Sequence, residues 1–290
     1  MPFASIEGIR THFQVTGKGP PLLLLAPIGD NAPIPQRWRD RAWRGFKPAE
    51  LLTSHFQVIS YDRRETCNSG GRVEPLSWRV FARHANALLD HLGIKQAFLL
   101  GSCVGCSVAL SLAAHFPDRC RALMLHWPVG GFLWLDRGRA CFDRHIEFAR
   151  VHGLAQVADR ARQSGLFWSD PEAGPWASVI ASDQSFAKFF VRQNFDRYLK
   201  VVEQSRDQLF NDTLPSGVTS SQLMTIPVPA FVMPGDDALH ATSAAHVLRE
   251  LMPHAKISPL MPRQQTAASI GDWVYESAAA CDQARPAAVA

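Results

Sequence analysis

The segment Gly101-Ser102-Cys103-Val104-Gly105 constrains the fold of this 290-residue chain more than any other segment does. It follows an apolar run, Ala97–Leu100, and opens a stretch of small and apolar residues that favours a helix, Val104–His115. A sharp strand-to-helix turn leaves no room for side chains beside its central residue, so glycines are expected on both sides of it. The pattern therefore predicts a strand, a tight turn that presents Cys103, and a helix.

Other short apolar runs, separated by helical stretches, predict a parallel β-sheet with helices on both faces. Residues 77–92 show the spacing of a helix with one buried face. The candidate strands are Arg10–Val15, Leu22–Leu25, Phe56–Tyr61, Ala97–Leu100, Ala122–Leu125, Ala230–Met233 and Lys256–Leu260. We therefore expect an α/β fold with a doubly wound, mostly parallel sheet.

The long gap between two of these strands predicts an inserted helical region. Residues 129–222 contain no strand-like run but include helical stretches near 140–163, 176–192 and 195–210. We expect residues 1–128 and 223–290 to form the α/β core and residues 129–222 to form a helical cap. Its aromatic residues fit either an apolar substrate pocket or a core between cap and sheet: Phe132, Trp134, Phe167, Trp168, Trp176, Phe186, Phe189 and Phe190.

Composition narrows the class of protein. The formal charge of +4 is spread along the chain without a basic block, so we expect no nucleic-acid partner. No apolar run reaches the length of a membrane span, and six cysteines in a chain of this length do not predict a disulfide framework. We expect a cytoplasmic protein without a metal or cofactor, whose partner is a small-molecule substrate and, as an open option, a second copy in a homodimer.

Four segments, in their order along the chain, carry a resemblance to a known family. Leu22–Gly29 resembles a strand followed by an oxyanion loop, and Tyr61–Ser69 resembles a D-x-R-G-x-G-x-S loop in which Glu65 and Cys67 replace glycines. The turn around Cys103 resembles a nucleophile elbow, and Pro234–Asp237 resembles an acid-bearing turn. Over residues 10–275 the chain resembles an α/β-hydrolase-fold protein with a helical cap.

The chain departs from the family pattern at three places. Ala26-Pro27 replaces a His-Gly pair, and Cys103 replaces the usual serine. Where a Gly-His pair normally follows the last strand, the chain reads Met261-Pro262-Arg263-Gln264-Gln265, and no histidine occurs after His254. The resemblance therefore implies a nucleophile and an acid but no C-terminal catalytic histidine.

Cys103 is the candidate nucleophile, because a position at a helix start favours the thiolate form. The resemblance implies oxyanion donors in the backbone N–H of Val104 and an N–H of the Ile28–Gly29 turn. Cys106 completes a Cys-x-x-Cys spacing that is also found in redox sites. Because the elbow already explains the glycines, a packing role for Cys106 is the simpler interpretation.

Two aspartates compete for the acid position, and two histidines compete for the missing base. Asp237 fits the acid-bearing turn better than Asp236, which would then cap the following helix. His126 ends its strand at the edge where parallel sheets bind ligands, so it is the first candidate base. His240, three residues after Asp237, is the second. Ordinary packing or surface roles remain the alternative for each histidine.

The remaining candidates would bind substrate. Arg263 and Gln264 occupy the approximate place of the missing base, and an arginine cannot accept a proton at ordinary pH. Arg263 could instead bind a substrate carboxylate or pair with Asp237, and Arg64 could act similarly. Trp127, next to His126, is a further candidate for substrate contact.

Three functions remain open at this point. The first is a hydrolase or acyl-transfer enzyme that acts through Cys103 on a small apolar ester, thioester, lactone or ketone. The second is a cofactor-free lyase or proton-transfer enzyme that forms no acyl-enzyme. The third is a small-molecule binding protein that has kept the pocket without the reaction.

Overall fold

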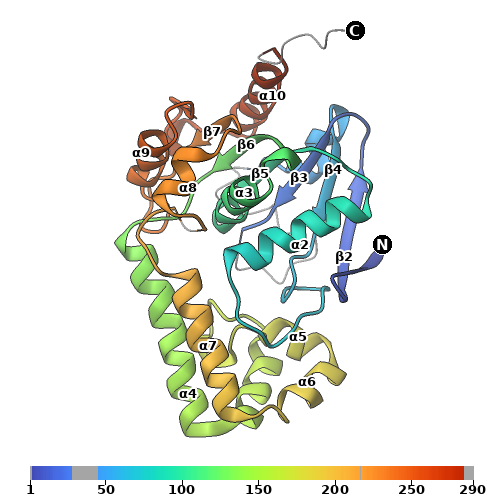
Figure 1. Cartoon of the computed structure of the whole chain (residues 1–290), viewed down its shortest axis with the longest axis vertical. Helices are drawn as coiled ribbons and strands as arrows, with labels where there is room; N and C mark the ends of the chain where they lie inside the picture. The colour runs from blue at the N-terminus through green and yellow to red at the C-terminus, as the bar shows by residue number, and fades with distance from the viewer. Residues whose placement is uncertain (1, 28–44, 216, 284–290) are drawn as a thin grey trace.

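An eight-stranded sheet forms the centre of the protein (Figure 1). The structure is a computed structural model that describes residues 2–27, 45–215 and 217–283. Along the sheet the strands follow the order β1-β2-β4-β3-β5-β6-β7-β8. Their bounds are β1 Phe3–Ile6, β2 Ile9–Thr16, β3 Pro21–Leu25, β4 Gln57–Tyr61, β5 Ala97–Ser102, β6 Cys120–His126, β7 Ala230–Met233 and β8 Lys256–Ile257.

The sheet is mostly parallel, as the sequence predicts. Strands β1, β2 and β4 pair antiparallel, whereas every pairing from β4 to β8 is parallel. Since β5 lies between β3 and β6, the carboxyl ends of three parallel strands meet beside Cys103. The doubly wound α/β fold is confirmed, with an additional N-terminal strand, β1, that the sequence analysis did not identify.

Helices cover both faces of the sheet, because alternate strand residues point to opposite sides. Leu23 and Leu25 pack with α2, α3, α8 and α9, whereas Leu22 and Leu24 pack with α10. These helices span α2 Trp78–His91, α3 Val104–His115, α8 Ser220–Thr225, α9 Thr242–Leu251 and α10 Ala267–Gln283. The short α1, Pro48–Leu51, precedes a 3-10 turn that leads into β4.

A helical insertion follows β6 and lies below the sheet in Figure 1. It consists of α4 Phe132–Ser164, α5 Ala177–Ser182, α6 Gln184–Phe190 and α7 Phe195–Leu209. Helices α4 and α7 lie side by side, and α4 is interrupted at Gly153, whose φ of 74° is not helical. α8 packs against α3 and α9, so it is part of the α/β layer. No helix in the described ranges is both long enough and apolar enough to span a bilayer.

Candidate active site

The elbow around Cys103 has the strained backbone that its glycines suggest. Cys103 has a φ of 55° and a ψ of −122°, a left-handed conformation that costs a non-glycine residue about 1–3 kcal/mol. A Cβ on Gly105 would lie 1.9 Å from the carbonyl oxygen of Leu25, and one on Gly101 would lie 2.6 Å from that of Gly105. The glycines therefore allow β3, β5 and α3 to approach closely and hold Cys103 in place.

The backbone around Cys103 fixes the direction of its side chain. The Cys103 N–H donates to the carbonyl oxygen of His126 at 3.1 Å, which ties the elbow to the end of β6. Val104 is the first residue of α3, and such an N–H has no acceptor within its own helix. The predicted second oxyanion donor, at Ile28 or Gly29, lies outside the described residues.

Cys106 has the packing role that its surroundings suggested. Its sulfur is fully buried and donates to the carbonyl oxygens of Gly101 and His126, each at 3.3 Å. Burial, followed by the charge of Cys103, raises the pKa of the Cys106 thiol well above its ordinary value. None of the six cysteines is part of a disulfide. Cys106 is therefore held as a neutral thiol inside the fold.

Asp237 and His240 form a compact pair on the loop after β7. Nδ1 of His240 lies 2.8 Å from Oδ1 and 2.9 Å from Oδ2 of Asp237. Oδ1 also accepts the backbone N–H groups of Leu239 and His240, both at 2.9 Å, so the carboxylate closes the turn that carries its partner. Gly235 makes room for this turn, since a Cβ there would lie 2.6 Å from Cβ of His240. Asp236 is exposed.

Cys103 influences the protonation of His240. Burial by itself lowers the pKa of His240, but interactions with Cys103, and then with Asp237, outweigh burial and raise it to about 9. Nε2 of His240 is buried, and it forms no hydrogen bond of good geometry with a described atom. Its interaction with Cys103 is therefore a looser contact. Apo enzymes often show such loose contacts, which tighten when substrate binds. The structure thus brings together Cys103, His240 and Asp237.

His126 has a different environment from the one predicted for a base. Its side chain is fully buried, and Nδ1 lies 3.2 Å from Oγ of Ser102. Burial, helped by the charge of His240, lowers the pKa of His126 to about 3. The ring stacks on Trp127 with centroids 5.6 Å apart. His126 is therefore a neutral imidazole beneath the site, and the geometry favours His240 over it as the base.

Gln265 fills the region where the family pattern has a histidine. It is 3% exposed, its Oε1 accepts from Nε1 of Trp127 at 2.7 Å, and its Nε2 donates to the carbonyl oxygens of Pro234 and Leu260, both at 2.9 Å. The Trp127 ring lies between His126 and His240, 5.7 Å from the latter. Trp127 thus contacts the histidines and is absent from the described lining of the pocket.

Arg263 and Gln264 do not lie where the sequence analysis expected substrate-binding residues. Both side chains are exposed, and both residues belong to a short 3-10 turn, Pro262–Gln264. Oε1 of Gln264 accepts from the N–H of Met261 at 3.1 Å. The expectation was wrong because the 3-10 turn directs Gln265 inward and Arg263 and Gln264 toward solvent.

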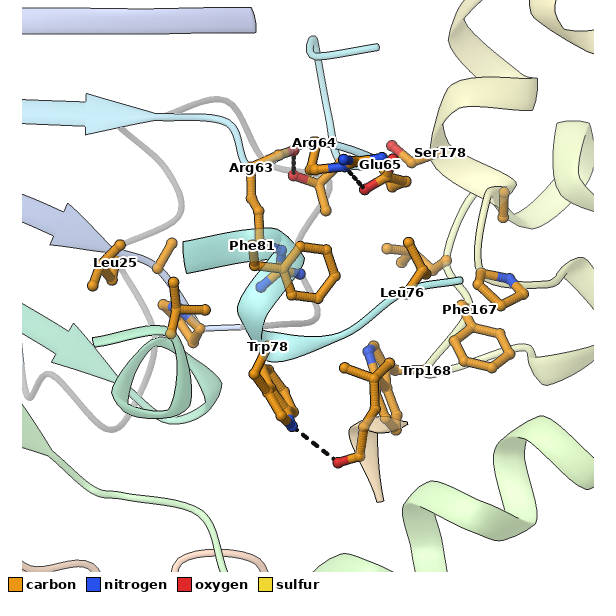
Figure 2. A pocket seen from close by; sticks show the side chains of 18 of the residues that line it. Leu25, Arg63, Arg64, Glu65, Leu76, Trp78, Phe81, Phe167, Trp168 and Ser178 are labelled. Atoms are coloured by element: carbon orange, nitrogen blue, oxygen red, sulfur yellow. Dashed lines mark hydrogen bonds and ion pairs between the residues drawn. The ribbon is translucent and has the colours of Figure 1, made fainter. Parts of the chain in front are cut away.

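A large apolar pocket lies between the sheet and the helical insertion (Figure 2). Arg63, Arg64 and Glu65 provide charged groups in its lining, with the hydroxyls of Thr66 and Ser178. Cys103 is not among its described lining residues, but the end of β3 and Val108 of α3 are, so the pocket adjoins the elbow. Its apolar side chains include Leu25, Leu76, Trp78, Phe81, Phe142, Phe167, Trp168 and Phe210.

The aromatic residues of the insertion divide between pocket, core and surface. Phe167 and Trp168 line the pocket, whereas Trp176 is buried and donates from Nε1 to the carbonyl oxygen of Arg72. Phe132 is 80% exposed and Phe189 is 55% exposed. Within the described ranges, no three His, Cys, Asp or Glu side chains are grouped so as to hold a metal ion.

Sequence reasoning missed two features of the site. The first is the Gln265–Trp127 hydrogen bond. Its signal in the sequence was Gln265 itself, the third of three polar residues in the segment after the last strand. The second is Glu65, a residue at a family glycine position that adopts a φ of 63°. A bulky residue with such a backbone conformation is unusual.

Comparison with known proteins agrees with this fold. Residues 20–142 match the family model of the alpha/beta hydrolase fold. An alpha/beta hydrolase from Sphaerobacter thermophilus superposes with a TM-score of 0.60 at 18% identity, over 95% of this chain and 99% of that one. This chain therefore has the α/β-hydrolase fold.

Two curated relatives match part of the chain. The putative carbamate hydrolase RutD of Azorhizobium caulinodans is 32% identical over 49% of this chain and 49% of its own length. The 2-hydroxymuconate semialdehyde hydrolase of a Pseudomonas species is 30% identical over 52% of this chain and 51% of its own length. The chain thus spans about half the length of the curated relatives it matches.

Proposed function

We propose that this protein is a hydrolase or acyl-transfer enzyme that acts on a small, largely apolar ester, thioester, lactone or ketone through Cys103. One observation carries the proposal: His240 is held by Asp237 and faces Cys103, and its pKa responds to both. The two curated relatives are named as hydrolases, which supports the same class of reaction. Cys103 would be the nucleophile, His240 the base and Asp237 the group that orients it.

The proposed reaction proceeds in two steps. Sγ of Cys103 attacks the acyl carbon, and His240 holds the thiol proton and passes it to the leaving oxygen, sulfur or carbon. The backbone N–H of Val104 would stabilise the developing oxyanion, together with a donor from the Ile28–Gly29 turn. Water, deprotonated by His240, then cleaves the acyl-cysteine and regenerates the thiol; another acceptor in place of water would give acyl transfer.

Asp237 would serve this cycle by fixing the tautomer of His240. Its carboxylate binds Nδ1, so Nε2 is the nitrogen that exchanges the proton with Cys103. Hydrogen bonds from His240 and backbone N–H groups outweigh partial burial and lower the pKa of Asp237. The acid therefore remains charged at neutral pH and can stabilise the imidazolium.

Covalent trapping tests the proposal. The intact protein is mixed with p-nitrophenyl acetate, quenched in acid and examined by mass spectrometry, with Cys103→Ala and Cys106→Ala as variants. We expect one acetyl group on Cys103 in the wild type and in Cys106→Ala, and none in Cys103→Ala. Turnover that survives Cys103→Ala would instead support the lyase or proton-transfer alternative. Binding of small apolar esters without turnover would support the binding-protein alternative.

A further inference from the structure

The polar side of the pocket contains a buried guanidinium group with one unused nitrogen. Arg64 has no exposed surface, and it lies on the loop after β4 that lines the pocket. Its Nε donates to both carboxylate oxygens of Glu65, and its Nη2 donates to Glu74. Its Nη1 is buried and finds no acceptor among the described residues. A buried donor of this kind normally has a partner.

A second donor lies at the same place. Oγ of Ser178 accepts from the N–H of Cys67 at 2.8 Å, which leaves the hydroxyl hydrogen available for another acceptor. Figure 2 shows Arg64, Glu65 and Ser178 gathered on one side of the pocket, across from Trp78. Two donors from separate parts of the chain, the β4 loop and α5, therefore converge at one end of an otherwise apolar cavity.

The charges of this region decide which kind of group would bind there. Glu65 and Glu74 already offset the charge of Arg64, and Arg63 in the same lining adds one positive charge. Among the described side chains of this region, the two arginines and two glutamates sum to zero, so these four groups offer an incoming anion no net charge. A carboxylate would lose its hydration and would meet Glu65 beside its partner. A neutral oxygen would gain the hydrogen bonds without that cost.

Glu65 is part of this arrangement. It adopts its left-handed conformation at a position where the family pattern has glycine, and it is 4% exposed. Its carboxylate also accepts the N–H of Arg72 at 3.1 Å. By occupying Nε of Arg64, Glu65 leaves Nη1 as the donor that remains for a ligand.

We propose that Arg64 and Ser178 form a subsite for a neutral carbonyl oxygen, and that the protein selects apolar acyl substrates that carry a keto group some carbons away from the reacting bond. The inference rests on the proposed function only in calling this ligand a substrate. It replaces the substrate carboxylate that the sequence alone suggested for Arg64.

Ligand binding tests the subsite separately from catalysis. The probes are methyl 5-oxohexanoate, methyl hexanoate and monomethyl glutarate, with the matching set of two more carbons, methyl 7-oxooctanoate, methyl octanoate and monomethyl pimelate. Dissociation constants are measured by calorimetry on the Cys103→Ala protein, so a failure of hydrolysis would count against the proposed function alone. We expect the keto ester of at least one length to bind about tenfold tighter than its hydrocarbon match, as a hydrogen bond to a charged group implies.

Variants locate the effect. In the Cys103→Ala protein, a further Ser178→Ala or Arg64→Lys substitution should remove most of the keto preference while leaving the affinity for the hydrocarbon ester within about twofold. If Arg64→Lys fails to fold, the comparison between the Cys103→Ala protein with and without Ser178→Ala still decides the question. Equal binding of keto and hydrocarbon esters at both lengths would overturn the proposal. Tightest binding of the carboxylates would also overturn it, because the subsite would then bind anions.

Discussion

The loop after β7 and the turn after β8 follow neighbouring strands of the sheet, yet they contribute in different ways. The β7 loop holds Asp237 and His240, three residues apart, as one hydrogen-bonded unit. The β8 turn, where the family pattern has its histidine, holds Gln265, which makes three buried hydrogen bonds. The difference suggests that the β7 loop can bring an imidazole to Cys103. The β8 turn, which has no histidine, then serves as structural support.

The two regions are joined through Trp127. Gln265 anchors the indole nitrogen, and the indole ring contacts the ring of His240. Trp127 has a φ of 51°, an uncommon conformation for a bulky residue, which the Gln265 hydrogen bond helps to maintain. The β8 turn therefore acts on His240 through packing, and the following predictions test this division of roles.

The largest effect is expected at the β7 loop. His240→Ala should reduce kcat for p-nitrophenyl acetate by about 10²-fold to 10⁴-fold, because it removes the base that we propose for Cys103. His246→Ala, an exposed histidine on α9, is the matched control and should change kcat by less than twofold. A His240→Ala enzyme with wild-type kcat would show that the proton is handled elsewhere, and His126→Ala would then be the next variant to measure.

A change at the β8 turn should affect stability more than chemistry. Gln265→Ala removes three buried hydrogen bonds and should lower the free energy of unfolding by about 2–4 kcal/mol. Urea denaturation measures this loss, and Gln264→Ala, at an exposed neighbour, should stay within about 0.5 kcal/mol of the wild type. We expect kcat of Gln265→Ala to fall by less than tenfold. A fall as large as that of His240→Ala would mean that the two regions share one catalytic role.

A titration distinguishes the contributions of Cys103 and Asp237 to His240. The imidazole should titrate with a pKa of about 9 in the wild type, followed by NMR. In Cys103→Ala this pKa should fall toward its ordinary value, because Cys103 is the larger of the two raising influences. An unchanged pKa in Cys103→Ala would show that the thiol and the imidazole are not coupled.

The same shift predicts how stability depends on pH. The pKa of His240 is higher in the folded protein than in the unfolded chain, where it is about 6.5. The stabilisation that protonated His240 gives to the folded state is therefore fully present below pH 6.5 and is lost as the pH rises through about 9. The difference in unfolding free energy between wild type and His240→Asn should narrow over this interval. A constant difference would contradict the protonation assigned to His240.

The fold and the position of the elbow could be predicted because each rests on a local pattern. Gly101 and Gly105 leave room only for backbone, and the apolar runs mark buried strands whatever surrounds them. The turn that holds Asp237 followed from the same kind of motif. These features depend on a few adjacent residues, so the sequence contains most of the information about them.

The choice between the two histidines could not be made in the same way. His126 and His240 both follow strands that end at the edge near Cys103, and strand position alone does not determine which way a ring points. The choice depends on burial, which holds His126 neutral, and on Cys103 and Asp237, which raise the pKa of His240. Likewise, the phase of the 3-10 turn decides that Gln265 faces inward, and the assembly of four charged residues decides the polarity of the pocket.

The smallest effect is expected when a histidine is restored to the β8 turn at its exposed positions. By resemblance alone, Arg263→His or Gln264→His would return an imidazole to the family's usual place and raise activity. Here both side chains face solvent, and Gln265 occupies the interior. An imidazole at either position would have to displace a residue with three hydrogen bonds to approach Cys103. We therefore expect both variants to hydrolyse p-nitrophenyl acetate within about twofold of the wild-type rate. A tenfold gain from either, or activity that appears when Gln264→His is combined with His240→Ala, would show that the turn can still deliver a base to Cys103.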